Sequence, residues 1–192
     1  MQASRLGRVY STPAWLTPTE RVLLYGLVLG ARPERSIEIG TLHGGSALLI
    51  IAALDDLGSG RLWCVEPEPR IDPMDWEQIR HRATLVQRPS PEGIEDAAER
   101  AGGVFGFALV DGDHGADAVN RDLTALLRTT DAGALVLLHD ALNPDVDAGI
   151  ESAIALGGWI DLGLLAKERT SEPDGLGRTV TFGGIRALRR AG

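Results

Sequence analysis

The sequence predicts an α/β domain in which a largely parallel β-sheet carries helices on both faces. Two observations indicate this class. Short apolar runs alternate with longer segments whose apolar residues follow helical spacing, and the short runs, such as FGFALV and ALVLL, are apolar almost throughout. Strands of that kind are buried on both faces, as in a parallel sheet covered by helices. With 192 residues, 44% of them hydrophobic, the chain is expected to form one domain, residues 1–192, around a single core.

The predicted elements follow one another in a regular order. Thr17-Pro18-Thr19-Glu20 has the pattern of a capping box at a helix start, so a helix should run from there to about Gly30. Strands are expected at 36–39, 61–65, 83–87, 105–110, 134–138, 162–167 and 179–186, and further helices at 46–57, from 73, at 91–101, 116–128 and 150–156. The last two strands, joined by a loop rich in Gly, Pro and Asp, should form an antiparallel terminal hairpin.

Composition excludes several classes of function. The formal net charge is −8, and the basic cluster of Arg186, Arg189 and Arg190 closes the chain, so we expect a solvated tail and no nucleic-acid partner. The single cysteine, Cys64, excludes an internal disulfide and fits a reducing compartment. No apolar run is long enough to cross a membrane, and the N-terminus lacks the pattern of a signal peptide. We therefore expect a cytoplasmic protein without a membrane partner.

The loop after the first predicted strand, residues 38–44, is the first candidate binding site. Ligands of open α/β sheets bind beyond the carboxyl ends of the strands, and this loop reads EIGTLHG. Gly40 and Gly44 let the backbone approach a ligand, and the following helix offers free N–H groups. A dinucleotide loop would have glycine at Leu42, and the lysine of a phosphate-binding loop is absent. Glu38, an anion beside the glycines, favours a cationic ligand.

A second carboxylate, Glu66, follows the second predicted strand. Its two oxygens can accept hydrogen bonds from both hydroxyls of a ribose, a property shared with NAD-dependent enzymes. For Glu38 and Glu66 alike, the alternative interpretation is a solvated charge at the end of a strand. The residues alone therefore leave open a nicotinamide-dependent oxidoreductase and a non-catalytic cofactor-binding subunit.

The motifs resemble those of class I S-adenosylmethionine (SAM)-dependent methyltransferases. They are similar to the small O-methyltransferases of the catechol and caffeoyl-CoA type and to a group often encoded beside sugar and antibiotic biosynthesis genes. The segments that carry the resemblance are IEIGTLHGGSA (37–47), LWCVEPE (62–68), ATLVQRPSPE (83–92), ALVDGDH (108–114) and LVLLHD (135–140). The resemblance implies a Rossmann-like seven-stranded sheet with a reversed last strand. It also implies SAM on Glu38, Gly40 and Ser46 at its methionine end, on Glu66 at the ribose and near Ser90 at the adenine, with Thr41, Gly44 and Asp111 completing the cofactor site.

The loops after the fourth and fifth predicted strands form the candidate reaction site. Asp111-Gly112-Asp113-His114 and His139-Asp140 come together if these strands are neighbours about 4.8 Å apart. Methyl transfer to oxygen requires an aligned acceptor that loses its proton. His114 is the predicted general base because histidine titrates near neutral pH, and Asp111 and Asp140 are its predicted catalytic partners. By resemblance, residues 111–114 form the D-x-x-H motif of sugar-modifying members.

The resemblance also implies a Mg²⁺ ion at these loops. Metal-dependent relatives place an aspartate after the fourth strand and two adjacent oxygen ligands after the fifth, where this chain has His139-Asp140. Magnesium prefers oxygen ligands. A metal site of Asp111, Asp140 and Asn143 is therefore expected only if the loop turns back, and a hydrogen-bonded structural His139 is the alternative.

The expected acceptor is a small hydroxylated molecule, a sugar or a phenolic natural product. The N-terminal helical segment, residues 1–33, is expected to contribute to the substrate side. Residues 170–177 form either a lid over the acceptor or an ordinary hairpin loop. The large side chains expected either to line the acceptor site or to form a homodimer contact are Tyr10, Trp15, Met74 and Trp76.

Overall fold

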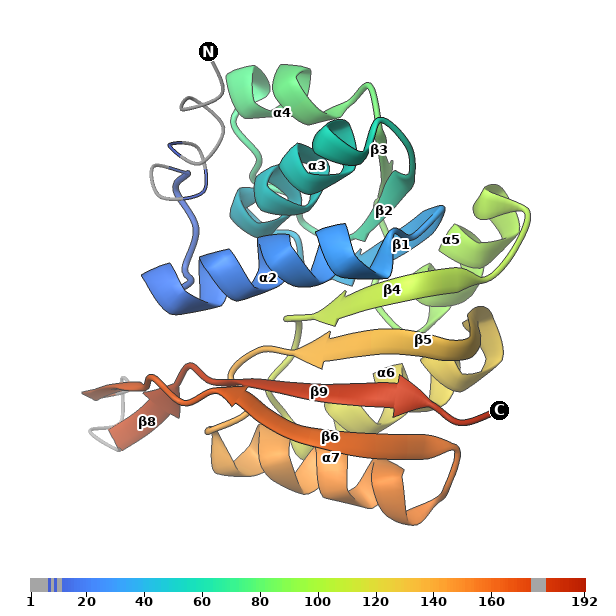
Figure 1. Cartoon of the computed structure of the whole chain (residues 1–192). Helices are drawn as coiled ribbons and strands as arrows, with labels where there is room; N and C mark the ends of the chain where they lie inside the picture. The colour runs from blue at the N-terminus through green and yellow to red at the C-terminus, as the bar shows by residue number, and fades with distance from the viewer. Residues whose placement is uncertain (1–6, 8, 10–11, 174–178) are drawn as a thin grey trace.

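A computed structural model describes residues 7, 9, 12–173 and 179–192 of the chain (Figure 1). In chain order the elements are α2 (Pro18–Ala31), β1 (Arg35–Ile39), α3 (Gly45–Leu57), β2 (Arg61–Val65), α4 (Pro73–Ile79), β3 (Ala83–Val86), α5 (Glu92–Ala101), β4 (Phe105–Val110), α6 (Ala116–Thr129), β5 (Thr130–Leu138), α7 (Pro144–Ala155), β6 (Trp159–Ala166), β7 (Thr170–Pro173), β8 (Thr179–Phe182) and β9 (Ile185–Arg190). Among the described residues, no helix has both the length and the apolar content needed to cross a membrane.

The main sheet has seven strands in the order β3-β2-β1-β4-β5-β9-β6. The strands from β1 to β5 are parallel, and β9 runs antiparallel to both of its neighbours, β5 and β6. The predicted fold class, a Rossmann-like, mostly parallel sheet of seven strands with a reversed last strand, is therefore confirmed.

The terminal segment differs in detail from the predicted hairpin. The expected strand at 179–186 is divided at Gly183-Gly184 into β8 and β9. Both glycines have positive φ, 91° and 84°, and a Cβ atom on Gly184 would lie 2.7 Å from Cγ of Leu142. Strand β8 pairs with β7 in a separate two-stranded sheet, which lies beyond the carboxyl ends of β4 and β5 (Figure 1).

Two apolar layers hold the helices against the sheet. One layer contains residues of α2, α3 and α4, and the other contains residues of α5, α6 and α7. The central strand β4 contributes to both layers: Phe105 packs in one and Phe107 in the other, because an irregularity in the register with β5 lies between them, and neither ring has any exposed surface. Replacing either ring by alanine should cost about 3–5 kcal/mol of stability.

The capping box predicted at the start of α2 is present. The Thr17 hydroxyl accepts a hydrogen bond from the Glu20 N–H (3.3 Å), and the Glu20 carboxylate accepts one from the Thr17 N–H (2.8 Å). Helix α7 begins earlier than the expected residue 150 because Asn143 caps it: Asn143 Oδ1 accepts a hydrogen bond from the Asp145 N–H (3.0 Å).

The prediction of a solvated basic tail is wrong for Arg186. Its side chain lies in β9, inside the sheet, and is 9% exposed. The guanidinium forms ion pairs with Asp161 (2.7 Å), Glu151 (2.6 Å) and Asp147 (2.8 Å). Because a buried guanidinium needs compensating charge, these carboxylates on β6 and α7 make the tail part of the sheet.

Candidate active site

Backbone hydrogen bonds bring the predicted site loops together just beyond the strand ends. The N–H of Gly40 donates to Val65 O (3.0 Å), that of Asp111 to Ile39 O (2.8 Å) and that of His139 to Val110 O (3.0 Å). The parallel registry thus continues one residue past β1, β4 and β5. As predicted from neighbouring strands, the loops that carry Gly40, Asp111 and His139 lie side by side.

The glycine loop packs directly against the loop after β4. A Cβ atom on Gly40, whose φ is 87°, would lie 2.0 Å from the carbonyl oxygen of Asp111, so only glycine fits there. Gly44 has a φ of 80° and forms the N-terminal cap of α3. Leu42, also at positive φ, donates its N–H to Glu66 (2.9 Å). The loop is therefore fixed between the ends of β2 and β4.

Glu38 is fully buried under this loop and forms no ion pair with any residue that the structure describes. Its Oε2 accepts a hydrogen bond from the Thr41 hydroxyl (2.6 Å), whereas Oε1 has no hydrogen-bond partner among the described residues. Burial raises the pKa of Glu38 to about 7, the hydroxyls of Ser46 and Thr41 oppose this rise, and the nearby charge of Asp111 adds to it. The predicted residues Glu38, Thr41 and Ser46 thus form one polar cluster with an unused acceptor.

The second predicted carboxylate, Glu66, is also buried and is oriented by the backbone. One of its oxygens accepts the Leu42 N–H and the other accepts the Glu68 N–H, each at 2.9 Å. A carboxylate oxygen has a second lone pair, so both can still accept from a ligand. Farther along this edge lies Asp122 on α6, a buried acid that sequence reasoning missed; burial raises its pKa to about 6, and the Ser90 hydroxyl opposes this rise.

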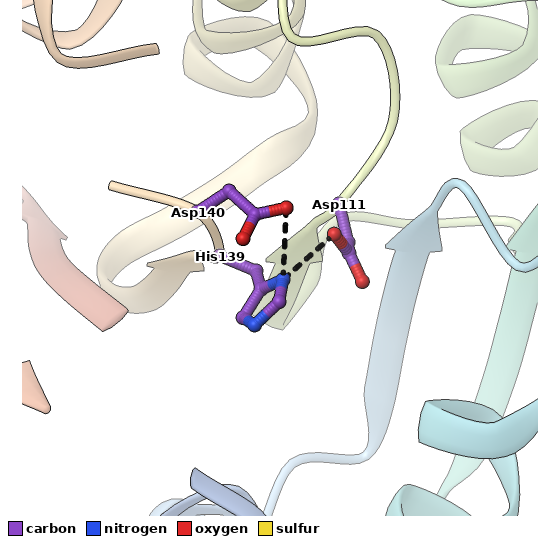
Figure 2. Close-up of side chains that lie close together, drawn as sticks. All are labelled: Asp111, His139 and Asp140. Carbon is purple, nitrogen blue, oxygen red and sulfur yellow. Dashed lines mark hydrogen bonds and ion pairs between the residues drawn. The ribbon is translucent and has the colours of Figure 1, made fainter. Parts of the chain in front are cut away.

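A cluster of acidic and imidazole groups lies after β4 and β5 (Figure 2). His139 points its Nδ1 toward Asp111 Oδ1 at 3.0 Å and Asp140 Oδ2 at 3.4 Å. One ligand atom from each of these three residues lies within 4.8 Å of the others, close enough to share a metal ion. The structure therefore brings together the predicted partners Asp111 and Asp140, with His139 between them.

The opposite edge of the His139 ring faces Glu20. Its Nε2 lies 3.4 Å from Glu20 Oε2, and both side chains are buried. Burial alone would lower the pKa of His139, but the negative charges of Asp111, Asp140 and Glu20 outweigh it and raise the pKa to about 12. His139 is therefore an imidazolium at neutral pH, and its proton is not available for exchange with a substrate.

His114 lies at the open side of the cluster. Its Nε2 is 2.9 Å from Asp140 Oδ2, and its side chain is 39% exposed, against 5% for His139. The adjacent carboxylate of Asp140 raises the pKa of His114 above its usual 6.5, and partial burial opposes this rise. The ring also meets Phe182 of β8 edge-on, with 6.0 Å between the centroids. Nε2 is buried against Asp140, so an acceptor can meet His114 only at the exposed remainder of its ring.

Asp140 is bound from three directions. His114 and His139 contact its Oδ2, and its Oδ1 accepts a short hydrogen bond from the Gly183 N–H. Burial would raise the pKa of Asp140, but these donors hold it well below the usual range. Asn143, the third predicted metal ligand, uses its amide oxygen to cap α7.

The large side chains expected to line the acceptor site differ in their exposure. Trp15 and Met74 are 82% and 78% exposed, and the Trp15 ring lies 5.8 Å from that of His43 in the glycine loop. Trp76 is partly buried in α4 and packs against the core. Tyr10 and residues 174–177 of the expected lid lie outside the described residues.

Sequence reasoning missed Glu20 and Phe182 as members of this site. Glu20 had a recognised role as a capping residue, and nothing in the local pattern distinguishes a buried capping glutamate from an exposed one. Phe182 lies in the predicted terminal strand, and its contact with His114 depends on the break at Gly183-Gly184.

Comparisons with known proteins agree on the type of domain. A profile of a family described as "Methyltransferase domain" matches residues 37–141. No curated protein matches the chain.

Solved structures of methyltransferases are similar over nearly the whole chain. An O-methyltransferase from Bacillus cereus, in complex with SAH, is 18% identical, with 99% of this chain and 92% of that chain covered and a TM-score of 0.65. The O-methyltransferase TomG from Streptomyces achromogenes, involved in tomaymycin synthesis and in complex with SAM, is 19% identical (100% and 92% covered, TM-score 0.65). Precorrin-6y C5,15-methyltransferase from Geobacter metallireducens is 15% identical (95% and 94% covered, TM-score 0.60). At these identities the likeness establishes a shared fold.

Proposed function

The chain belongs to the methyltransferase domain family, and from this premise we propose that it transfers the methyl group of SAM to a hydroxyl group of a small molecule. The observation that carries the proposal is Glu38, a fully buried carboxylate with one unused oxygen beneath a glycine loop. SAM carries an ammonium group beside its sulfonium centre, and a buried carboxylate without a cation is a natural partner for such a group.

The other cofactor residues support SAM in the same way. Glu66, already oriented by two backbone N–H groups, has the remaining lone pairs needed by the ribose hydroxyls. Gly40 and Gly44 keep the loop free of side chains at both ends, and the edge after β3 carries Ser90 for the adenine side. The structural neighbours crystallised with SAM or SAH have the same fold, which agrees with this assignment.

In the proposed reaction, His114 removes the proton from the acceptor hydroxyl as its oxygen attacks the methyl group, and the bond from that methyl group to the sulfonium sulfur breaks, leaving SAH. His114 is exposed enough to meet an acceptor, whereas His139 is buried between three carboxylates. Asp140 orients the His114 ring and stabilises the imidazolium that forms after proton transfer. The acceptor class, a sugar or phenolic hydroxyl, stays a proposal, with Phe182 as a candidate wall beside the base.

The residues do not fit a magnesium ion. The three candidate ligand atoms include a nitrogen, Nδ1 of His139, whereas magnesium prefers oxygen ligands. The amide oxygen of Asn143, which the oxygen-based alternative requires, is bound to the backbone of α7. We therefore assign no step of the reaction to Mg²⁺, and the positive charge at this position comes from His139.

We further propose that the described elements act as one methyltransferase domain in which the N-terminal segment contributes to the substrate side. Helix α2 supports this, because Glu20 reaches the cluster beside His139. The predicted cytoplasmic location and the homodimer contact stay predictions.

Calorimetric titration of the protein with SAM, and separately with NAD, tests the cofactor. We expect SAM to bind and NAD not to bind; the opposite result would overturn the proposal in favour of an oxidoreductase. The second step is incubation with methyl-labelled SAM and a panel of catechols, other phenols and sugars, followed by mass spectrometry of the products. SAM binding without label transfer to any hydroxyl compound would instead favour a non-catalytic subunit.

A further inference from the structure

We propose that Glu20 is a positioning residue of the active site, which holds the His139 ring and the β8–β9 junction, Gly183-Gly184, in a single arrangement. The proposal deepens the proposed function and rests on it for its catalytic meaning. The contacts themselves are independent of which acceptor the protein methylates.

Three donors converge on the two carboxylate oxygens of Glu20. Oε1 accepts the Gly184 N–H (2.8 Å), while Oε2 accepts the Thr17 N–H (2.8 Å) and faces His139 Nε2 (3.4 Å). These donors come from positions 3, 119 and 164 residues away in the sequence. Glu20 therefore joins the start of α2, the loop after β5 and the start of β9.

A capping role alone does not explain this arrangement. A capping carboxylate needs one oxygen for the N-cap backbone and is ordinarily exposed to solvent, whereas Glu20 has no exposed surface. Burying a charge is costly unless it is paired, and here the pairing partner is His139. The second oxygen binds Gly184, which is distant from the helix cap.

The consequence for the site is a fixed orientation of His139. An imidazole held by an acceptor at Nε2 must present Nδ1 in the opposite direction, where Asp111 and Asp140 lie. The two junction glycines donate consecutive N–H groups, Gly183 to Asp140 and Gly184 to Glu20. These two hydrogen bonds attach the end of β8, the strand that carries Phe182, to Asp140 and Glu20, two of the carboxylates that surround His139.

Two variants of Glu20 and one matched control test the proposal. Glu20→Gln keeps the shape but offers one acceptor oxygen to three donors, so at least one donor must face the amide NH₂ group. Glu20→Ala removes all three contacts. The control, Thr17→Ala, removes the hydroxyl that caps α2 but leaves the Glu20 carboxylate and its contacts with His139 and Gly184 intact.

The readouts are the hydrogen-exchange rates of the His139 ring N–H groups, by NMR of protein labelled with ¹⁵N-histidine, and of the Gly184 amide. In Glu20→Gln we expect both to exchange at least about ten-fold faster than in the wild type, in line with the loss of a charge-assisted hydrogen bond. In Thr17→Ala we expect both rates to stay within about two-fold, although the melting temperature falls by about 2–4 °C.

The proposal would be overturned if both groups exchanged in Glu20→Gln as slowly as in the wild type. It would also be overturned if Thr17→Ala, compared at the same stability, accelerated exchange as much as Glu20→Gln does. Should Glu20→Ala not fold, Glu20→Gln carries the test alone. A SAM titration of the same proteins tests the proposed function separately. If the wild type did not bind SAM, the proposed function would be overturned, and the exchange rates would still test the role of Glu20. With an active acceptor, Glu20→Gln should lower kcat at least about ten-fold with little change in the KM for SAM.

Discussion

Glu38 and Asp140 are both buried acids at the carboxyl edge of the same sheet, and their surroundings are opposite. Glu38 has hydroxyl neighbours and no cation, and burial raises its pKa to about 7. Asp140 lies between two imidazoles and a backbone N–H, and its pKa is held well below the usual range. Among the described residues, the half of the site around Glu38 therefore offers its acid no cationic partner, whereas the half around Asp140, the paired half, already contains the His139 imidazolium.

This difference indicates which ligand each half is built to receive. A carboxylate buried without a counter-ion is stabilised by a ligand that brings a cation, and a carboxylate already paired with histidines gains little from one. The cofactor side should thus be sensitive to the charge of its ligand. The acceptor side should be sensitive to loss of its own histidines and insensitive to added metal.

The largest expected effect concerns the exposed histidine of the paired half. His114→Ala should lower kcat for methyl transfer by about 10²–10⁴-fold, because it removes the general base. Label transfer from SAM to the acceptor found in the panel measures it. The Kd for SAM, from calorimetry, should stay within about three-fold and serves as the control for folding. Unchanged turnover would show that His114 is not the general base, and its difference in exposure from His139 would then have no catalytic meaning.

A change of Asp140 tests the pairing itself. In the wild type, activity should rise with pH as His114 loses its proton, through a pKa above the usual 6.5. Asp140→Asn removes the main cause of that raised pKa, so the activity profile should move to lower pH. The pH dependence of kcat/KM measures the shift. A move to higher pH would contradict the assigned ion pair.

The next effect tests the unpaired carboxylate. Glu38→Gln should weaken SAM binding by about 10–100-fold, since a charge-assisted hydrogen bond contributes about 1.5–3 kcal/mol. Calorimetry gives the Kd directly. SAH binding provides a second measurement, because it keeps the ammonium group and lacks the sulfonium charge. An unchanged Kd for both ligands would mean that Glu38 is buried for structural reasons alone.

The pH dependence of SAM affinity sharpens the same point. Because the pKa of free Glu38 is about 7 and the ammonium group selects its ionised form, SAM affinity should fall as pH decreases through 7. Between pH 8 and pH 6 the affinity should fall about ten-fold. Binding should also release protons from Glu38, which the buffer takes up. Glu38→Gln should abolish this dependence, and a flat wild-type profile would contradict the raised pKa.

The smallest expected effect is that of metal removal. EDTA treatment followed by addition of Mg²⁺ should change methyl transfer by less than about two-fold, because His139 already provides the charge between Asp111 and Asp140. Loss of activity on chelation and its recovery with Mg²⁺ would contradict this prediction and show that the reaction requires a metal ion.

The sequence predicted most of the fold because its signals are local. Apolar runs, the capping box at Thr17 and the glycines at 40 and 44 each describe a few consecutive residues, and the parallel sheet then places Gly40, Asp111 and His139 side by side. The sites that stayed hidden depend on distant partners. Glu20 meets His139 across 119 residues, and no periodicity distinguishes its buried carboxylate from an exposed cap.

Competing local roles explain the remaining differences. Asn143 was expected as a metal ligand only if its loop turned back, and instead its amide oxygen begins α7. Arg186 belongs to the basic cluster that closes the chain and was therefore expected in a solvated tail, yet β9 inserts between β5 and β6 and buries it. Both outcomes are decided by tertiary packing, which residue types alone do not specify.

The insertion of β9 also bears on how the protein is made. Strand β6 leaves the ribosome before β9, but among the described strands it pairs with β9 alone, so it has no place in the sheet until residues 185–190 have emerged. Gly184, which binds Glu20, emerges at almost the same moment. Completion of the sheet and fixation of the acceptor half thus depend on the same short segment, and a nascent chain stopped before residue 184 would lack both the partner strand of β6 and the N–H group that binds Glu20.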